Sequence, residues 1–458
     1  MQIPAEAAEI EPGHAYTWRI SFPDLPADPG SRRPASYNQA AHLAAACSAH
    51  LSDRPPPFAL AIACSFELTS SIDLSALEGA LLHLIRRHEV LRTCCRRTAR
   101  SVSIHVRTPE ETHLERADAG PRLSRVATRT HLHELLQLVD PVTGPLMVAG
   151  AIVREGSATV HVVYDHLVAD VISAPITVAD LARAYEDLAH GRRPDPTPAG
   201  SYLDFAREER THNHALRAQD EQLQHWRGFL TDGGEHPPAF PLDLGVRPGH
   251  VHPSVNRTRT LLPGPLTDQM ETACRTSGGS LLTGLLAATA ATLREEGGPD
   301  IYRALMPINR RGQHRYSRSI GWFINAVPLA IPAPRSASLA SRLALARAGY
   351  EPARQQADVH SVRAQQLLRS ADATSEVHRP VSFFSYLDFR TAQGAEHPST
   401  RTATVHAWSS ACNGSLLWFH RNHSGLHLNS LHADTPLARQ TTDSLAHRLV
   451  RTLLSFSE

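Results

Sequence analysis

The sequence predicts a mixed α/β (α+β) fold in two lobes that meet at a cleft. The chain has 458 residues, of which 41% are hydrophobic, enough for two or three domains or for one large two-lobed body. Strand-like and helical periodicities occur in both halves, and a stretch with three prolines, 192–200, separates them. We therefore expect an N-terminal extension over 1–30, a first lobe over 31–195 and a second lobe over 196–458.

Apolar residues repeat at intervals of three and four in several segments, which predicts amphipathic helices. The first helix is predicted over 73–91. The second opens at Thr177, because Thr177 and Asp180 have the spacing of a capping box. In the second half, a long charged helix is predicted over 202–230 and a buried one over 280–296.

Runs rich in β-branched and aromatic residues predict strands in both halves. These runs are 58–68, 159–164, 301–308, 320–331, 381–389, 402–408, 415–420 and 426–431.

The basic residues exclude several kinds of chemistry, because the chain contains no lysine and its 46 basic side chains are all arginine. A Walker A loop, a pyridoxal-phosphate Schiff base and a lysine general base are therefore ruled out. The 46 basic and 45 acidic side chains nearly cancel, so the charge gives no sign of nucleic-acid binding.

The chain has no segment that predicts export or membrane insertion. Its first thirty residues lack the basic start and apolar run of a signal peptide, and no run of about 18 apolar residues predicts a membrane span. The six cysteines have no CxxC spacing, which indicates reduced and mostly buried thiols. We therefore expect a cytoplasmic protein.

The segment 159–170 carries the pattern best suited to chemistry. A β-branched strand is followed by His166, and Asp170 comes four residues later in a short loop before a helix. A loop at a strand end exposes a side chain while the strand holds it in place. The HxxxD spacing alone is a weak signal, because the 28 histidines give a second such pair, His161 and Asp165.

The surroundings of this pattern strengthen it. Residues 165–170 resemble the HHxxxDG motif of the condensation domains of nonribosomal peptide synthetases and of their relatives, the polyketide-associated and chloramphenicol-acetyltransferase-like acyltransferases. Further elements similar to those of that superfamily occur in the same order: Ser-x-x-Gln at 36–39, RHEVLRT at 87–93, YLDF at 202–205, HW at 225–226 and GWFINAVP at 321–328.

The resemblance implies two chloramphenicol-acetyltransferase-like lobes that form a V, with the active site at their interface. It gives His166 the role of a base or a substrate-orienting group. Asp170 would be structural, fixing the loop through a salt bridge to an arginine of the second lobe. The matching arginine is Arg311, with Arg310 as the alternative.

Substrate contacts are expected from Asp165, Val171, Trp322 and Asn325, although Trp322 also suits a place in the core. Two of these residues depart from the family pattern. Asp165 stands where the first histidine of the motif usually is, and the family tolerates variation there. Val171 replaces a glycine, which allows positive φ and close approach to the backbone. We expect the valine either to narrow the acceptor channel or to leave the site inactive.

These residues suit acyl transfer from a thioester, which is already activated and needs no serine or cysteine nucleophile. The resemblance implies a stand-alone condensation enzyme or acyltransferase that forms an amide or ester bond in natural-product biosynthesis, such as nonribosomal peptide, polyketide or antibiotic biosynthesis. The donor would be an acyl thioester on the phosphopantetheine of a carrier protein or of coenzyme A, and the acceptor an amine or an alcohol. No other cofactor and no membrane partner is expected. Because the length is that of one such domain, the partners would come in trans.

Two alternatives remain open. A catalytically degenerate condensation domain would dock a carrier protein or recruit another enzyme; Val171 favours this alternative, whereas the intact His166 and Asp170 oppose it. A histidine-rich metal hydrolase is the weaker alternative, because three HxH pairs, where about 1.7 are expected by chance among 28 histidines, are no signal. No metal site is expected, and four C-terminal histidines are predicted at the surface: His420, His423, His427 and His432.

Overall fold

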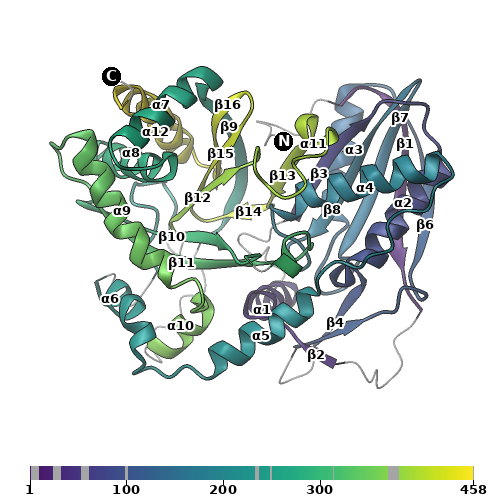
Figure 1. The fold of residues 1–458 in the computed structure, drawn as a ribbon, viewed down its shortest axis with the longest axis horizontal. Helices are drawn as coiled ribbons and strands as arrows, with labels where there is room; N and C mark the ends of the chain where they lie inside the picture. The colour runs from purple at the N-terminus through teal and green to yellow at the C-terminus, as the bar shows by residue number, and fades with distance from the viewer. Residues whose placement is uncertain are drawn as a thin grey trace. The chain divides into compact units, whose positions relative to one another are not determined.

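The computed structural model describes residue 1 and residues 10–23, 32–52, 61–97, 102–232, 237–247, 250–312, 314–369 and 381–456. Backbone contacts divide the chain into two units, and neither is continuous in sequence. The N-terminal unit comprises Met1–Thr211, Arg311–Phe323 and Phe389–Ser409, and the C-terminal unit comprises the remaining residues. Figure 1 shows the elements of both units.

A six-stranded antiparallel sheet forms the centre of the N-terminal unit (Figure 1). Its strand order is β13 (Thr404–Trp408), β3 (Ala61–Leu68), β8 (Ser157–Asp165), β7 (Met147–Arg154), β1 (Gly13–Ser21) and β6 (His113–Arg122). A smaller antiparallel sheet contains β2 (Arg32–Pro34), β5 (Val102–Val106) and β4 (Thr93–Arg97).

Helices cover both faces of the six-stranded sheet. The helices of this unit are α1 (Tyr37–Ser52), α2 (Leu74–Arg87), α3 (Arg125–Gln137), α4 (Ser173–Ala189), α5 (Tyr202–His214) and α11 (Ser399–Thr402), with short 3₁₀ turns at Glu89–Arg92 and His314–Tyr316. Helices α2 and α4 pack against each other, and the Tyr164 hydroxyl of β8 bonds Thr177 of α4 at 3.0 Å. Val163, the next residue along β8, belongs to the apolar cluster under α3, so β8 is buried on both faces.

The C-terminal unit contains a seven-stranded mixed sheet. Its strand order is β11 (Ile324–Pro332), β10 (Ile301–Asn309), β12 (Phe383–Asp388), β15 (Ser415–Asn422), β16 (Gly425–Ala433), β9 (His252–Pro263) and β14 (Ala411–Cys412). Strand β12 runs parallel to both of its neighbours, and the other pairs are antiparallel.

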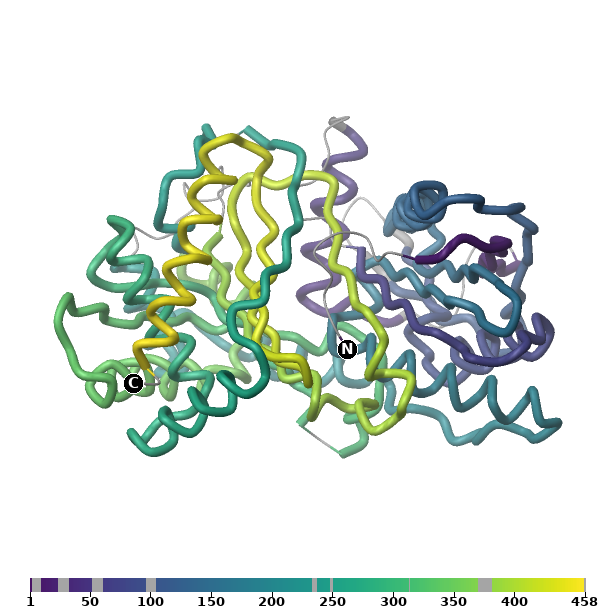
Figure 2. The backbone as a smooth tube through the Cα atoms, turned by 90° about the horizontal axis from the view of Figure 1, so that it is seen from above, coloured from purple at the N-terminus to yellow at the C-terminus, as the bar shows by residue number. Residues whose placement is uncertain are grey.

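The helices of the C-terminal unit also lie on both faces of its sheet. They are α6 (Gln224–Asp232), α7 (Gly264–Thr276), α8 (Leu281–Glu295), α9 (Leu339–Gln355), α10 (Ser361–Leu368) and α12 (Pro436–Ser455), with a 3₁₀ turn at Glu221–Leu223. Helix α8 packs between α9 and α12 in the main core, and Figure 2 shows α12 running along β16 and β9. Helices α6 and α10 belong to a second apolar cluster with Leu305 of β10.

Five expectations about the elements and the domain boundaries require correction. Within the expected extension over 1–30, the described residues 13–21 are not separate from the first lobe, because they form β1, which lies inside the six-stranded sheet between β7 and β6. Helix α4 begins at Ser173, four residues before Thr177, and Thr177 donates its hydroxyl to the Ser173 carbonyl at 2.9 Å as a mid-helix residue does.

The predicted helix over 202–230 is interrupted: α5 ends at His214 and α6 begins at Gln224. The Asp220 carboxylate accepts a bond from Arg217 N at 2.9 Å, a local bond that competes with helical pairing. The predicted buried helix over 280–296 is confirmed as α8, which has a capping box at Ser280.

The predicted strand over 320–331 begins only at Ile324, because residues 311–323 pack in the N-terminal unit. The boundary between the units falls within α5, after Thr211, and not at residue 195. The sequence division at 195/196 therefore does not separate the two units. The V-shaped arrangement of the lobes stays a prediction.

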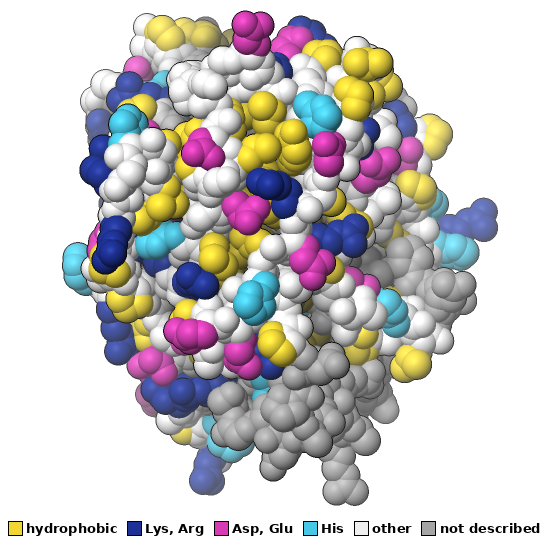
Figure 3. All heavy atoms as spheres, turned by 90° about the vertical axis from the view of Figure 1, so that its right-hand side faces the viewer, with side chains coloured by type: hydrophobic (Ala, Val, Ile, Leu, Met, Phe, Trp, Pro, Cys, Tyr) yellow, Lys and Arg dark blue, Asp and Glu magenta, His cyan; other side chains and the backbone are white. Residues whose placement is uncertain are grey.

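The surface and the thiols agree with the composition. Figure 3 shows acidic and basic side chains interspersed over one face, as expected from their nearly equal numbers. All six cysteines are free, and four of them are buried. Of the described helices, none combines the length and the apolar character needed to cross a bilayer.

Candidate active site

The loop between β8 and α4, residues 166–172, carries the histidine of the HxxxD pattern. Its start is held by Asp165, the last residue of β8, whose Oδ1 accepts a bond from Leu167 N at 2.8 Å. His166 is half-buried, and its Nδ1 lies 2.7 Å from the Ala169 carbonyl oxygen. A carbonyl oxygen only accepts hydrogen bonds, so Nδ1 carries the proton and Nε2 of the neutral ring keeps its lone pair. His166 is therefore in the tautomer that a general base requires.

Trp322 covers one face of this imidazole. The two rings are stacked with centroids 3.8 Å apart and planes 20° apart. Burial lowers the pKa of His166 below its usual value, and the neighbouring His42 lowers this pKa further. Because a lowered pKa favours the neutral ring, His166 can accept a proton at neutral pH. The indole of Trp322 thus contacts the His166 ring and does not lie in the core.

Asp170 and Arg311 form a buried ion pair below the loop. Arg311 Nη1 lies 2.7 Å from Asp170 Oδ2, and Arg311 Nη2 lies 2.8 Å from Asp170 Oδ1. The two side chains are only 2% and 1% exposed. Asp170 also accepts bonds from Ser173 N at 2.9 Å and from Phe323 N at 3.0 Å. The carboxylate is therefore fully surrounded by donors and has a structural role in holding the loop.

The pair fastens the segment 311–323 to the start of α4. Arg311 Nε donates to Ser319 O at 2.9 Å, and Arg311 Nη2 donates to Gly321 O at 3.0 Å. At Gly321 a Cβ atom would lie only 2.6 Å from the Tyr202 ring, so this close approach requires glycine. The same ring donates its hydroxyl to the Trp322 carbonyl at 3.3 Å. These contacts fix the backbone on both sides of Trp322.

The partner of Asp170 is Arg311 and not the alternative, Arg310. Arg310 pairs with Asp358, a carboxylate that is 73% exposed. Arg311 follows residue 196 in sequence but belongs to the N-terminal unit, so the expectation that the salt bridge reaches the second lobe is wrong in this respect.

Asn325 belongs to the C-terminal unit, where its side-chain amide is hydrogen-bonded to backbone groups. Its Nδ2 donates to Ala357 O at 3.0 Å and to Val359 O at 2.8 Å, and its Oδ1 accepts from Ser361 N at 3.0 Å. The geometry thus gives Asn325 a role in holding the turn before α10. A contact of Asn325 with substrate stays a prediction.

The Ser-x-x-Gln element is a capping box at the start of α1, and it holds the histidine loop. Ser36 Oγ accepts from Gln39 N at 3.1 Å, and Gln39 Oε1 accepts from Ser36 N at 3.0 Å. The remaining Gln39 amide group donates to Leu167 O at 2.9 Å. The i, i+3 spacing of serine and glutamine signals the cap, but nothing in the sequence signals the bond to Leu167.

The RHEVLRT element connects α2, α4 and the segment 311–323. His88 Nδ1 accepts from Ile320 N at 3.3 Å, so its Nε2 carries the proton and donates to Asp180 at 3.0 Å. Arg87 Nε donates to the same carboxylate at 3.1 Å. Burial lowers the pKa of His88, which suits a neutral structural ring. These contacts give the element a structural role.

Asp165, just before the loop, and Val171, within it, are the two residues that depart from the family pattern. Asp165 Oδ1 lies 3.0 Å from Nε2 of His42, a residue of α1 that no sequence motif marks. Val171 precedes α4 in a turn where Ser173 N bonds Asp170 O and Ala174 N bonds Val171 O, at 2.9 and 3.2 Å. Two successive i to i+3 bonds are a right-handed 3₁₀ pattern, so Val171 meets no requirement for positive φ.

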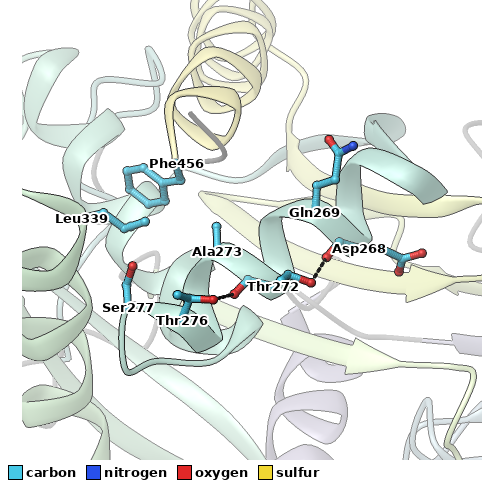
Figure 4. A pocket seen from close by; sticks show the side chains of 8 residues that line it. All are labelled: Asp268, Gln269, Thr272, Ala273, Thr276, Ser277, Leu339 and Phe456. Carbon is cyan, nitrogen blue, oxygen red and sulfur yellow. Dashed lines mark hydrogen bonds between the residues drawn. The ribbon is translucent and has the colours of Figure 1, made fainter.

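A pocket elsewhere in the structure has fewer side chains that could take part in a reaction. A pocket of about 600 Å³ opens on the C-terminal unit, but the hydroxyls of Thr272 and Thr276 in its wall donate to carbonyls of their own helix (Figure 4). Its lining consists of Asp268, Gln269, Thr272, Ala273, Thr276, Ser277, Leu339 and Phe456.

The C-terminal histidines are not surface residues, with the exception of His423. His420, His427 and His432 are 1%, 2% and 0% exposed, because β15 and β16 are inner strands of the seven-stranded sheet. Among the described residues, no three His, Cys, Asp or Glu side chains are placed to hold a metal ion.

Known structures share the whole fold. The structure titled "PapA2 acyl transferase" matches with a TM-score of 0.87 at 20% identity and covers 100% of both chains. The first condensation domain of the calcium-dependent antibiotic synthetase matches with a TM-score of 0.72 at 17% identity, over 93% of this chain and 97% of that one. The X-domain from teicoplanin biosynthesis matches with a TM-score of 0.72 at 20% identity, over 95% and 97%. At these identities the likeness establishes the fold alone.

Curated relatives match over most of the chain. Acyltransferase PapA3 of Mycobacterium tuberculosis is 24% identical over 332 residues, which are 71% of this chain and 69% of the relative. The 2'-acyl-2-O-sulfo-trehalose (hydroxy)phthioceranyltransferase PapA1 of Mycobacterium bovis is 26% identical over 399 residues, 83% and 73% of the two chains. A linear gramicidin synthase of Brevibacillus parabrevis is 30% identical over 271 residues, 57% of this chain and 5% of the relative. The family model "Condensation domain" matches residues 57–411, most of the chain. The chain therefore belongs to the condensation-domain family.

Proposed function

We propose that this protein transfers an acyl group from a thioester donor to an amine or an alcohol, with His166 as the general base. The observation that carries the proposal is the state of His166: its Nδ1–H is bound to the Ala169 carbonyl at 2.7 Å, and its pKa is lowered by burial. Nε2 is thereby left unprotonated for an acceptor, on a loop held by the buried Asp170–Arg311 pair.

The chemistry follows from the reactivity of the thioester. The acceptor oxygen or nitrogen attacks the thioester carbonyl, and His166 Nε2 takes the proton that the acceptor loses. The new C–O or C–N bond forms as the C–S bond breaks, and the thiolate that leaves takes up the same proton from His166, which returns to its neutral form. The thioester is activated before it arrives, so the reaction needs no acyl-enzyme intermediate and no ATP.

The donor that we propose is an acyl group on a phosphopantetheine thiol, borne by a carrier protein or by coenzyme A. The acceptor that we propose is an alcohol or an amine, and the names of two relatives support this range: PapA1 is named for an acylated sulfotrehalose, and linear gramicidin synthase for a peptide. A role in natural-product biosynthesis rests on the same relatives.

The test is intact-mass and product analysis with a panel of donors and acceptors. Acyl-coenzyme A and acylated carrier proteins are each mixed with alcohols and amines, and the matching free acid with ATP and magnesium serves as the donor control. We expect transfer from thioesters alone. Replacement His166→Ala should lower kcat by about 10²–10⁴-fold, the usual effect of losing a positioned base, while the exposed His423→Ala has no effect. Wild-type turnover by His166→Ala would refute the assignment.

A non-catalytic docking or recruiting module is the second candidate, and the bulk of Val171 is the observation that favours it. A structure titled "Complex of the X-domain and OxyB from Teicoplanin Biosynthesis" has the same fold, with a TM-score of 0.70 at 22% identity. If the wild type binds carrier proteins but transfers nothing from any thioester, and Val171→Gly gains transfer, this second function is the correct one.

A further inference from the structure

The active-site loop has a second histidine–carboxylate pair beside it, formed by His42 of α1 and Asp165 of β8. His42 Nε2 lies 3.0 Å from Asp165 Oδ1, and the two side chains are 10% and 7% exposed. A carboxylate only accepts hydrogen bonds when ionised, so His42 Nε2 carries a proton and donates it. His42 and Asp165 are 123 positions apart in sequence but lie in the same unit, the N-terminal one.

His42 also contacts the indole that covers the reactive ring. The His42 ring meets Trp322 edge-on, with centroids 5.6 Å apart and planes at 81°, and the Trp322 face stacks on His166 at 3.8 Å. Asp165 in turn holds the loop, since the oxygen that accepts from His42 also accepts from Leu167 N at 2.8 Å. His42 therefore reaches His166 by two routes, through Asp165 and through Trp322.

We propose that His42 is a positioning residue for His166, and that it acts through its bond to Asp165, which stands in place of the first histidine of the motif. The inference rests on the proposed function for its catalytic readout. Of the two routes, the bond to Asp165 dominates. A nearly buried carboxylate that loses a donor is destabilised by more than the loss of one edge-to-face ring contact.

Three replacements of His42 separate the two routes. His42→Gln keeps an N–H donor near the position of Nε2 but removes the ring. His42→Phe keeps a ring edge against Trp322 but removes the donor. His42→Ala removes both. The matched control is His50→Ala, because His50 lies on the same helix and bonds Asp140 at 3.0 Å, but its side chain is 49% exposed and remote from the motif.

We expect kcat to fall by about 10–100-fold in His42→Ala and His42→Phe, because a small displacement of a reacting group has effects of this size. The KM for the thioester should stay within about threefold, since His42 acts on the ring and not on donor binding. His42→Gln should recover kcat to within about threefold of wild type, and His50→Ala should equal wild type. Equal losses in His42→Gln and His42→Phe, or losses that follow only the melting temperature, would overturn the proposal.

A second readout does not depend on turnover. The emission of Trp322 is obtained as the difference between each protein and the same protein with Trp322→Phe, because a stacked imidazolium quenches indole fluorescence. We expect acid quenching of this difference in wild type and in His42→Gln, and weaker quenching in His42→Ala. If the wild type transfers nothing, the proposed function fails while this measurement still decides the inference. Unchanged quenching in His42→Ala would then refute the positioning role.

Discussion

Replacement of Asp170 by alanine should destabilise the N-terminal unit strongly. The carboxylate accepts two bonds from Arg311, at 2.7 and 2.8 Å, and one each from Ser173 N and Phe323 N. Both side chains of the ion pair are at most 2% exposed. Loss of the Asp170 carboxylate therefore leaves the Arg311 guanidinium buried without its charged partner. Breaking a buried pair in this way costs about 3–5 kcal/mol in unfolding free energy.

The assay is denaturant and thermal unfolding, followed by a signal from the N-terminal unit. For a unit of this size, 3–5 kcal/mol corresponds to a decrease in the midpoint of roughly 6–20 °C. Arg310→Ala is the matched control, since its partner Asp358 is 73% exposed and a surface pair contributes about 0–1 kcal/mol. The double variant Asp170→Ala/Arg311→Ala should lose less than the sum of the single losses, because both act on one pair.

One result would refute the reasoning. If Asp170→Ala had the melting temperature of the wild type but a much lower kcat, the carboxylate would act in the chemistry and not in holding the loop. If Asp170→Ala and Arg310→Ala were equally mild, the buried pair would have no special structural weight.

Three further predictions concern protons and the acceptor. Burial lowers the pKa of His161 to about 3, of His406 to about 4 and of His420 to about 3. The unfolded chain therefore binds more protons below pH 6.5, and each histidine should remove about 1.4 kcal/mol of stability at pH 5.5 relative to pH 8. Urea titrations at the two pH values test this, and an unchanged stability would contradict it. Because burial lowers the pKa of His166, the acid limb of kcat/KM should lie below pH 6.5, and a limb above that pH would exclude His166 as the base. Val171→Gly should broaden the range of acceptors and keep the rate with the native acceptor within about an order of magnitude, whereas a uniform loss would assign Val171 a rigidifying role.

The sequence predicts the elements whose pattern is local and fails where the partner is distant. Periodicity identifies α8 and β8, because each is apolar at the spacing of its own type of element. It does not identify β1 as an inner strand, since the strand lies among proline- and glutamate-rich residues and its pairing with β6 and β7 is non-local. It also places the start of α4 too late, because Asp170, whose carboxylate accepts from Ser173 N, has the same i, i+3 spacing to Ser173 as Thr177 has to Asp180, and spacing alone does not distinguish the two pairs.

The residues of the site also divide into those that the sequence predicts and those that it does not. The motif predicts His166 and Asp170, which are four residues apart, and the family resemblance predicts Arg311, with Arg310 as the alternative. No motif identifies His42, because a bond between α1 and β8 leaves no periodic trace in either segment. The division into units was missed for a related reason: residues 311–323 follow β10 in sequence but are tied to the start of α4 by Arg311.

The two departures from the motif have local structural reasons, and these bear on whether the site is active. At position 165 an aspartate stands in place of the motif's imidazole and bonds His42, and Val171 lies in a turn with the 3₁₀ pattern of backbone bonds. A module that only recruits partners needs a stable loop, and apolar side chains would supply this at no greater cost than a buried ion pair. What an apolar loop would not supply is one fixed tautomer of His166, with Nδ1–H on a carbonyl and an indole against its face. His88 also has one fixed tautomer, but both of its ring nitrogens bond protein groups, whereas the proton on His166 Nδ1 leaves the lone pair of Nε2 to accept a proton. This difference favours the acyltransferase over the recruiting module.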